Sequence, residues 1–248
     1  MSFKPEIKVS GELSVRDVKS TLHGSPTTTL RQHVIKALYD GTTLGVIDKL
    51  VLVDTTDVER DYTTTLGRSI SANQLTITAT ISITASYSIA KVRSYVGTVL
   101  YFETALASAI PVNSGDTVSV TLTITVSISG NLTYGTSTFP LTMGVFGNRV
   151  ARVLGADLDV SYLKVNDIQF VGTDSEGSPQ QIPATPTKTL SADGLSMTMS
   201  ASITPTFYFN ISEIRIRTTD VQNLWYYGGL TISVPANSTL NYSETVTA

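Results

Sequence analysis

Alternating apolar and polar residues dominate the readable part of this chain. The clearest stretch runs from Thr117 to Ser129, TVSVTLTITVSIS, in which Val, Leu or Ile occupies every second position. Successive side chains of a β-strand point to opposite faces, so this pattern predicts a long strand that is buried on one face. At about 3.3 Å per residue it would span about 40 Å, so we expect it to bend, to change sheets or to extend past its own domain. The same alternation occurs in residues 75–83 and 195–203.

Helical periodicity is confined to two short segments. Residues 29–39, TLRQHVIKALY, carry apolar residues at helical spacing and are followed by Gly41. Residues 145–154, VFGNRVARVL, are followed by Gly155 in the equivalent position. Glycine just beyond the last turn commonly ends a helix because it adopts the left-handed conformation without strain. The sequence therefore predicts two short helices in a chain that otherwise consists of strands.

The two halves of the chain are similar to each other. SANQLTITATISIT, which starts at Ser71, aligns without gaps on SADGLSMTMSASIT, which starts at Ser191, with identical residues at seven of 14 positions. Three flanking pairs follow in the same order: IDKLVLVD with VNDIQFVG, IAKVR with ISEIR, and LYF with LWY. A chance match in a Ser- and Thr-rich sequence is the alternative. Ordered matches with insertions confined to loops favour an internal duplication of one domain.

The succession of strands without βαβ alternation predicts an all-β fold. We expect two tandem antiparallel β-sandwich or jelly-roll-like domains that arose by internal duplication, each with one short helix. The expected boundaries are an N-terminal arm at 1–28 that includes a strand at residues 6–13, a first domain at 29–130, a linker at 131–140 and a second domain at 141–248. The linker is placed there because this stretch is rich in turn-forming residues.

Composition narrows the classes of function. Ser and Thr together account for 66 residues, only 15% of the residues are charged, and the net charge is −3. A hydroxyl-rich surface without clusters of Lys or Arg argues against a nucleic-acid partner and against an anionic membrane. The absence of Cys excludes disulfides and thiolate metal sites. We also expect neither export nor membrane insertion, because the chain shows no signal-peptide pattern and no long apolar stretch.

Candidates for catalytic chemistry are few. The chain has two histidines, His23 in a loop-like segment and His33 in the first predicted helix, and neither recurs in the second half. No nucleophile elbow, P-loop, HExxH or dinucleotide-binding motif is present. The sequence therefore predicts a protein that is not an enzyme and that uses no cofactor.

Acidic residues gather in the loop DTTDVERD, and the matching loop of the second half is GTDSEGS. Carboxylates in a loop can bind calcium, but the ligand spacing of an EF-hand is missing. A solvated turn is the favoured interpretation and a calcium site is the alternative. The metal candidates are Asp54, Asp57, Glu59 and Asp61.

One dense aromatic cluster stands out. Trp225, Tyr226 and Tyr227 are consecutive, and an exposed row of aromatic rings could bind a ligand by stacking on sugars. The cluster aligns with the segment LYF of the first half, which favours packing in a core or an interface instead.

These segments together carry a resemblance to a known group of proteins. A short helix ended by Gly precedes strands of the kind seen in VIDKLVLVD, ISEIRIR, NSGDTVSVTLTITVSIS and NSTLNYSETVTA. The pattern resembles the β-rich modules of phage tail-collar and tail-fibre proteins, and of appendage or shell proteins of viruses that infect archaea. It covers most of residues 30–129 and 145–247. The resemblance implies a non-enzymatic virion protein, in a tail, spike, turret or shell, that acts by self-assembly.

The same resemblance implies partners and a location. The partners would be copies of this chain and other virion proteins, with a host surface glycan added if the protein also attaches to the host. The location would be the virion. A carbohydrate-binding or adhesive cell-surface module is the alternative function.

Charge is missing from two long stretches of the chain, 104–148 and 221–243, apart from Asp116. Exposed strand edges are normally protected by Lys, Pro or inward charges, and interface cores are depleted of charge. The polar face of the long strand carries only hydroxyls, so we expect a homo-oligomer in which this face meets another copy. The expected interface residues are Ser119, Thr121, Thr123, Thr125 and Ser127.

Overall fold

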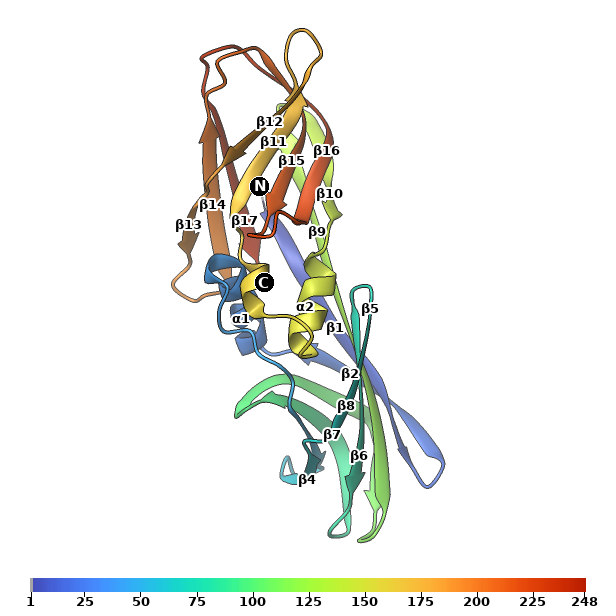
Figure 1. Cartoon of the computed structure of the whole chain (residues 1–248). Coiled ribbons are helices and arrows are strands. Elements are labelled where there is room, and N and C mark those ends of the chain that lie inside the picture. Colours follow the sequence, from blue (N-terminus) through green and yellow to red (C-terminus); the bar gives the residue numbers. More distant parts are fainter. Residues whose placement is uncertain (1) are drawn as a thin grey trace.

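The structure is a computed structural model that describes residues 2–248. It contains 61% strand and 11% helix, which confirms the all-β class. The molecule is elongated, with curled, largely antiparallel sheet at both ends and two helices at the waist between them (Figure 1). The first half is built from β1 to β9 and the second half from β9 to β17.

The sheet of the first half runs in the order β5-β6-β9-β1-β2-β8-β7-β3-β4, and every neighbouring pair is antiparallel. Apolar side chains of its strands point to the inside of the curl, as the alternation predicts. The strands are β1 (Ser2–Val15), β2 (Val18–Pro26), β3 (Lys49–Asp54), β4 (Glu59–Thr63), β5 (Leu66–Ser71), β6 (Gln74–Ser82), β7 (Tyr87–Val96), β8 (Val99–Val112) and β9 (Thr117–Tyr134).

The sheet of the second half runs in the order β13-β14-β17-β1-β9-β10-β16-β15-β11-β12. Its one parallel pair joins β1 to β17. The remaining strands are β10 (Ser137–Met143), β11 (Asp167–Thr173), β12 (Pro179–Ala184), β13 (Thr187–Leu190), β14 (Ser196–Ile203), β15 (Phe209–Arg217), β16 (Asn223–Val234) and β17 (Leu240–Thr247).

Two strands belong to both halves. β1 and β9 are antiparallel over almost all of β1, from Ser2 opposite Asn131 to Val15 opposite Val118. In Figure 1 they run along most of the molecule. The long strand expected at 117–129 therefore extends past its own domain, which was one of its three predicted arrangements.

Both predicted helices form and end at the predicted glycines. α1 (Thr28–Asp40) starts at Thr27, whose hydroxyl accepts the Leu30 N–H, and ends at Gly41 in the left-handed conformation. α2 (Phe146–Leu154) ends at Gly155, and a short 3₁₀ turn, η1 (Val160–Leu163), follows it.

Each helix packs on both halves, and contacts its own half through β8 in the case of α1 and through β16 in the case of α2. α1 contacts β13 and β14, and the Gln32 side chain donates to the Asp193 carbonyl at 2.7 Å. α2 contacts β5 and β6, and the Asn148 side chain donates to the Ala72 carbonyl at 2.6 Å. Together with β1 and β9, this exchange ties the halves into one hydrophobic core.

Two of the expected boundaries need correction. Residues 2–26, expected in an arm, form β1 and β2, which pair with each other and with three further strands. Residues 131–140, expected as a linker, form the ends of β9 and β10, a hairpin that turns at Gly135. Turn-forming residues mark a hairpin turn and a domain linker equally, so composition could not separate the two.

Candidate functional site

The acidic loop of the first half is a compact turn held by one carboxylate. Asp54 ends β3, and its Oδ1 accepts the backbone N–H groups of Thr56 at 2.8 Å and Val58 at 3.0 Å. Its Oδ2 pairs with the Arg60 guanidinium at 2.5 Å. Burial raises the pKa of Asp54, but these hydrogen bonds outweigh it and hold the pKa well below its ordinary value.

The second half contains the same turn at Asp174. Its Oδ1 accepts the N–H groups of Glu176 and Ser178 at 3.0 and 2.9 Å, and its Oδ2 accepts the Gln180 side chain at 3.0 Å. The fourth residue of each turn has a positive φ, at Asp57 (65°) and Gly177 (84°). Both loops are turns, as the favoured interpretation has it, but the first is held by a buried carboxylate and is not simply a solvated turn.

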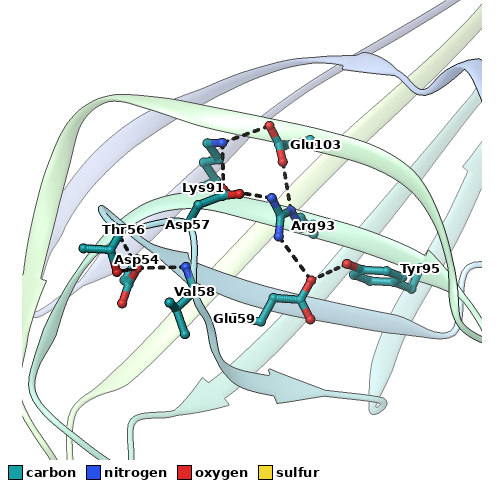
Figure 2. A network of polar contacts seen from close by, with 9 residues as sticks. All are labelled: Asp54, Thr56, Asp57, Val58, Glu59, Lys91, Arg93, Tyr95 and Glu103. Carbon is teal, nitrogen blue, oxygen red and sulfur yellow. Dashed lines mark hydrogen bonds and ion pairs between the residues drawn. The ribbon is translucent and has the colours of Figure 1, made fainter.

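Two further acids of the first loop, Asp57 and Glu59, belong to an ion-pair network on the outer face of β7 and β8 (Figure 2). Asp57 lies 3.0 Å from Lys91 and 2.8 Å from Arg93. The Arg93 guanidinium also reaches Glu59 at 3.3 Å and Glu103 at 2.8 Å. These ion pairs therefore hold the β3–β4 turn against β7 and β8.

Every carboxylate of this network already has a cation. Hydrogen bonds from Lys91 and Arg93 lower the pKa of Asp57. Burial raises the pKa of Glu103, but the same two cations outweigh it and lower the pKa overall. Burial and the Tyr95 hydrogen bond to Glu59 raise the pKa of Tyr95 to about 12. At neutral pH the two carboxyl groups are therefore held in their ionised form and the Tyr95 phenol in its neutral form.

The fourth metal candidate points elsewhere. Asp61 is buried in β4, and its Oδ1 accepts the N–H and the hydroxyl of Thr84 at 3.2 and 2.6 Å. Across residues 2–248 no three His, Cys, Asp or Glu side chains converge in a way that could hold a metal ion. In the structure Asp54 holds the β3–β4 turn, Asp57 and Glu59 belong to the ion-pair network, and Asp61 binds Thr84.

The two histidines lie on β2 and on α1. His23 is exposed on β2. His33 in α1 places Nδ1 2.7 Å from the Tyr101 hydroxyl, and that oxygen accepts the Gly45 N–H. Burial and nearby Lys36 lower the pKa of His33, which keeps the ring neutral at pH 7. No carboxylate hydrogen-bonds to either ring in that part of the chain.

The aromatic cluster is mostly interior. Trp225 and Tyr227 are fully buried, and only Tyr226 is partly exposed, so neither buried ring offers a face to a sugar. Both buried side chains donate to the carboxylate of Glu244, which the Tyr242 hydroxyl also contacts at 2.7 Å. Burial raises the pKa of Glu244. Sequence reasoning missed this residue, although it stands at an inward position of the alternating segment LNYSETV.

The expected interface strand is not an edge. β9 is hydrogen-bonded to β6 on one side and to β1 on the other from residue 118 to 125, so its backbone has no free edge there. The edge argument for the interface was therefore wrong. Alternation is the same in central and edge strands, and for that reason it could not reveal the error. The five hydroxyl residues instead lie on the outer face of the sheet.

On β6 and β9 this outer face carries hydroxyl groups and no charged side chain. We call it the β6–β9 plate. Its cross-strand pairs are Thr76 with Thr123, Thr78 with Thr121, Thr80 with Ser119 and Ser82 with Thr117. None of these pairs hydrogen-bonds across the strands within the described structure. The corresponding face of β14 and β17 behaves differently, because its pairs bond to each other: Thr198 with Thr245, Ser200 with Ser243, Ser202 with Asn241 and Thr204 with Thr239.

No family model matches this chain, and neither does a curated protein or a solved structure. No helix among residues 2–248 is long and apolar enough to cross a membrane. The geometry above is thus the basis for any functional argument.

The turn at Asp54 gives a first testable result. We expect Asp54→Asn to lower the melting temperature at pH 7, because the uncharged amide keeps the turn but loses the ion pair with Arg60. The pKa of Asp54 is lowered in the folded state, so its contribution is present above the unfolded pKa near 3.9 and is lost as the pH falls. The difference between the two proteins should therefore begin to shrink below about pH 5 and keep shrinking below pH 3, until the folded-state pKa is passed.

Asp174→Asn is the matched control, since it removes the same turn carboxylate where the side-chain partner is the neutral Gln180. Thermal melts read by circular dichroism should show a smaller loss. An equal or larger loss in the control would contradict the role given to Arg60.

Proposed function

We propose that this protein is a non-enzymatic structural protein that assembles with copies of itself through the β6–β9 plate. The observation that carries the proposal is the difference between two equivalent faces. On β14 and β17 the hydroxyls use one another as partners. On β6 and β9, within the described residues, only Thr125 has a cross-strand partner, the Gln74 amide at 3.3 Å, and the four hydroxyl pairs named above leave their donors and acceptors for another molecule.

A second copy is the partner that suits this surface best. A hydroxyl both donates and accepts a hydrogen bond, so a plate of hydroxyls is complementary to itself, which a surface of one charge is not. Two-fold contacts bring identical patches together. The threonine methyl groups add apolar area. β6 and β9 contribute no ion that must be desolvated, although neighbouring β1 places Glu12 opposite Thr121 and Lys8 opposite Thr125 on the same face.

The distribution of ionisable groups supports a role without catalysis. The largest ion-pair network is saturated, and the neutral His33 meets a phenol instead of an acid. Because the sequence resembles tail-fibre and archaeal-virus modules, we propose that the assembly is part of a virus particle. Recovery of the protein at many copies from purified particles would support that setting, and recovery of particles without it would contradict it.

The two halves are proposed to descend from one duplicated unit. In this proposal most strand pairs correspond, as in β3–β7 with β11–β15 and β7–β8 with β15–β16, but the second sheet has one strand more because β1 lies between β17 and β9. The irregularity after Ile89 in β7 recurs after Ile211 in β15.

The gapless sequence match does not follow the strand pairing. Leu75 lies opposite Ile70 in β5 and Ile124 in β9. The matching place in the second half, opposite Leu190 in β13 and Val246 in β17, is taken by Met197 and not by Leu195, because the β13–β14 turn is longer.

The assembly proposal predicts the result of a triple substitution. Thr121→Lys, Thr123→Lys and Thr125→Lys together should leave a folded protein whose self-association is at least about 100-fold weaker, because unpaired charges buried in a contact cost several kcal/mol. Sedimentation velocity over a range of concentrations measures the effect, and circular dichroism checks the fold.

Ser200→Lys, Ser202→Lys and Asn241→Lys form the matched control on the self-bonded face. We expect this variant to associate like the wild type. A wild type that stays monomeric at every concentration, or a control that loses association equally, would overturn the proposal.

A further inference from the structure

A pocket of about 220 Å³ lies at the waist of the molecule, where the middle of β1, the end of β2 and the start of α1 meet. At about 30 Å³ per molecule, it has room for about seven waters. Its lining includes the outer side chains of β1, the chain from Gly24 to Pro26, two residues of α1 and Ala248. None of the features discussed so far involves this pocket.

The backbone of β1 is open on the side that faces the pocket. β17 pairs with β1 only as far as Phe3, and β2 pairs with it only from Val9 onward. Between them, residues 4–8 have β9 as their sole strand partner within the described chain. On the side away from β9, the backbone of this gap has no strand partner in the described structure, and Pro5 has no N–H to donate there.

Cations converge on the same opening. Lys4 and Lys8 project from β1 and Arg31 from the first turns of α1. Glu6, the acidic side chain in the lining, is bonded to Lys8 at 3.2 Å. Lys4 and Arg31 have neither an ion pair nor a side-chain hydrogen bond within residues 2–248. The first turn of α1 contains no acidic residue, so the positive end of the helix dipole adds to their field.

We propose that the waist pocket binds a small oxyanionic group, such as a phosphate, sulfate or carboxylate, with Arg31 as its principal ligand and Lys4 as the second. A planar guanidinium matches two oxygens of such a group, and an ammonium adds a point charge. The size of the pocket limits the ligand to a single group. The net charge of −3 disfavours a long polyanion, because most of it would lie against a negative body.

Isothermal titration calorimetry of the full chain tests this inference. Inorganic phosphate, sulfate and acetate are titrated separately in a buffer free of these ions, with sodium chloride at matched ionic strength as the blank. Glycerol phosphate is a further arm, which distinguishes a free ion from a phosphate carried by a larger molecule. We expect saturable binding of at least one oxyanion at one site per chain.

Two variants locate the site. Arg31→Gln should weaken binding by about tenfold or more, and Lys4→Gln by less. Lys19→Gln is the matched control, because it removes the same charge from exposed β2, where Lys19 pairs with Glu12 at 2.9 Å outside the pocket. It should bind like the wild type.

The inference fails if no oxyanion binds saturably, if both pocket variants bind as well as the wild type, or if Lys19→Gln causes the same loss. Since Lys4 is exposed on a strand held by β9, Lys4→Gln remains informative even if the helix variant is unstable.

Discussion

Replacing Trp225 with Ala is expected to cost roughly 3–5 kcal/mol of the free energy of unfolding. The side chain is fully buried, and its ring lies 4.4 Å from the ring of Phe3 and 6.2 Å from that of Phe146. Truncation would leave a large cavity where β1, α2 and β16 meet. It would also remove one of the donors to buried Glu244.

Urea denaturation followed by fluorescence and circular dichroism measures this loss, with Tyr226→Ala as the neighbouring control. Tyr226 is partly exposed on the opposite face of β16, so its truncation should cost about 1 kcal/mol or less. Equal losses would mean that the indole does not anchor the core as described. A glycan-binding assay on Trp225→Ala would report this loss of stability and not a sugar contact.

Arg149→Met should be the second most harmful change, at about 3 kcal/mol. The guanidinium is buried, and it donates to the Tyr162 carbonyl at 2.6 Å, to the Thr218 hydroxyl at 3.0 Å and to Asp220 at 2.5 Å. A thioether fills similar space but leaves these acceptors without a donor. This loss of unfolding free energy is at the low end of the range for breaking a buried ion pair. Asp220 is more than a third exposed, so water can solvate its carboxylate once Arg149 is replaced.

The loss should depend on pH. The hydrogen bond from Arg149 lowers the pKa of Asp220, so the pair stabilises the fold above the unfolded pKa near 3.9 and ceases to do so in acid. Stability measured from pH 7 to pH 3 should therefore show the variant approaching the wild type. Arg152→Met, an exposed neighbour in α2 that pairs with Asp157, is the control and should cost well under 1 kcal/mol. A pH-independent loss would contradict the assignment to Asp220.

The sequence predicted those features that depend on neighbouring residues. Alternation identified β6, β9 and β14, and helical spacing with a terminal glycine identified α1 and α2. The turn at Asp54 was foreseen because an aspartate can hold a turn through its own side chain. In each case the cause lies within about ten residues, so the pattern carries it.

Features that depend on distant partners were not predictable. Nothing in residues 2–26 shows that β9 and β17 will pair with them, so an arm with one strand at 6–13 was expected where the structure has two strands built into both sheets. Trp225 was correctly favoured as interior, yet its acceptor Glu244 was overlooked as one more acid near the end of the chain. The burial of Arg149 could not be predicted either, because the three residues that accept its hydrogen bonds lie in other segments of the chain.

The pairing of β1 with β17 determines when the protein can complete its fold during synthesis. Ser2 and Phe3 are synthesised 243 residues before their partners Thr245 and Val246. Until β17 has emerged from the ribosome, the second sheet cannot close and this end of β1 keeps one edge unpaired. Such long-range closure is intrinsically slow, and an unpaired strand invites contact with neighbouring chains. The native state should therefore form only after residue 246 has left the ribosome.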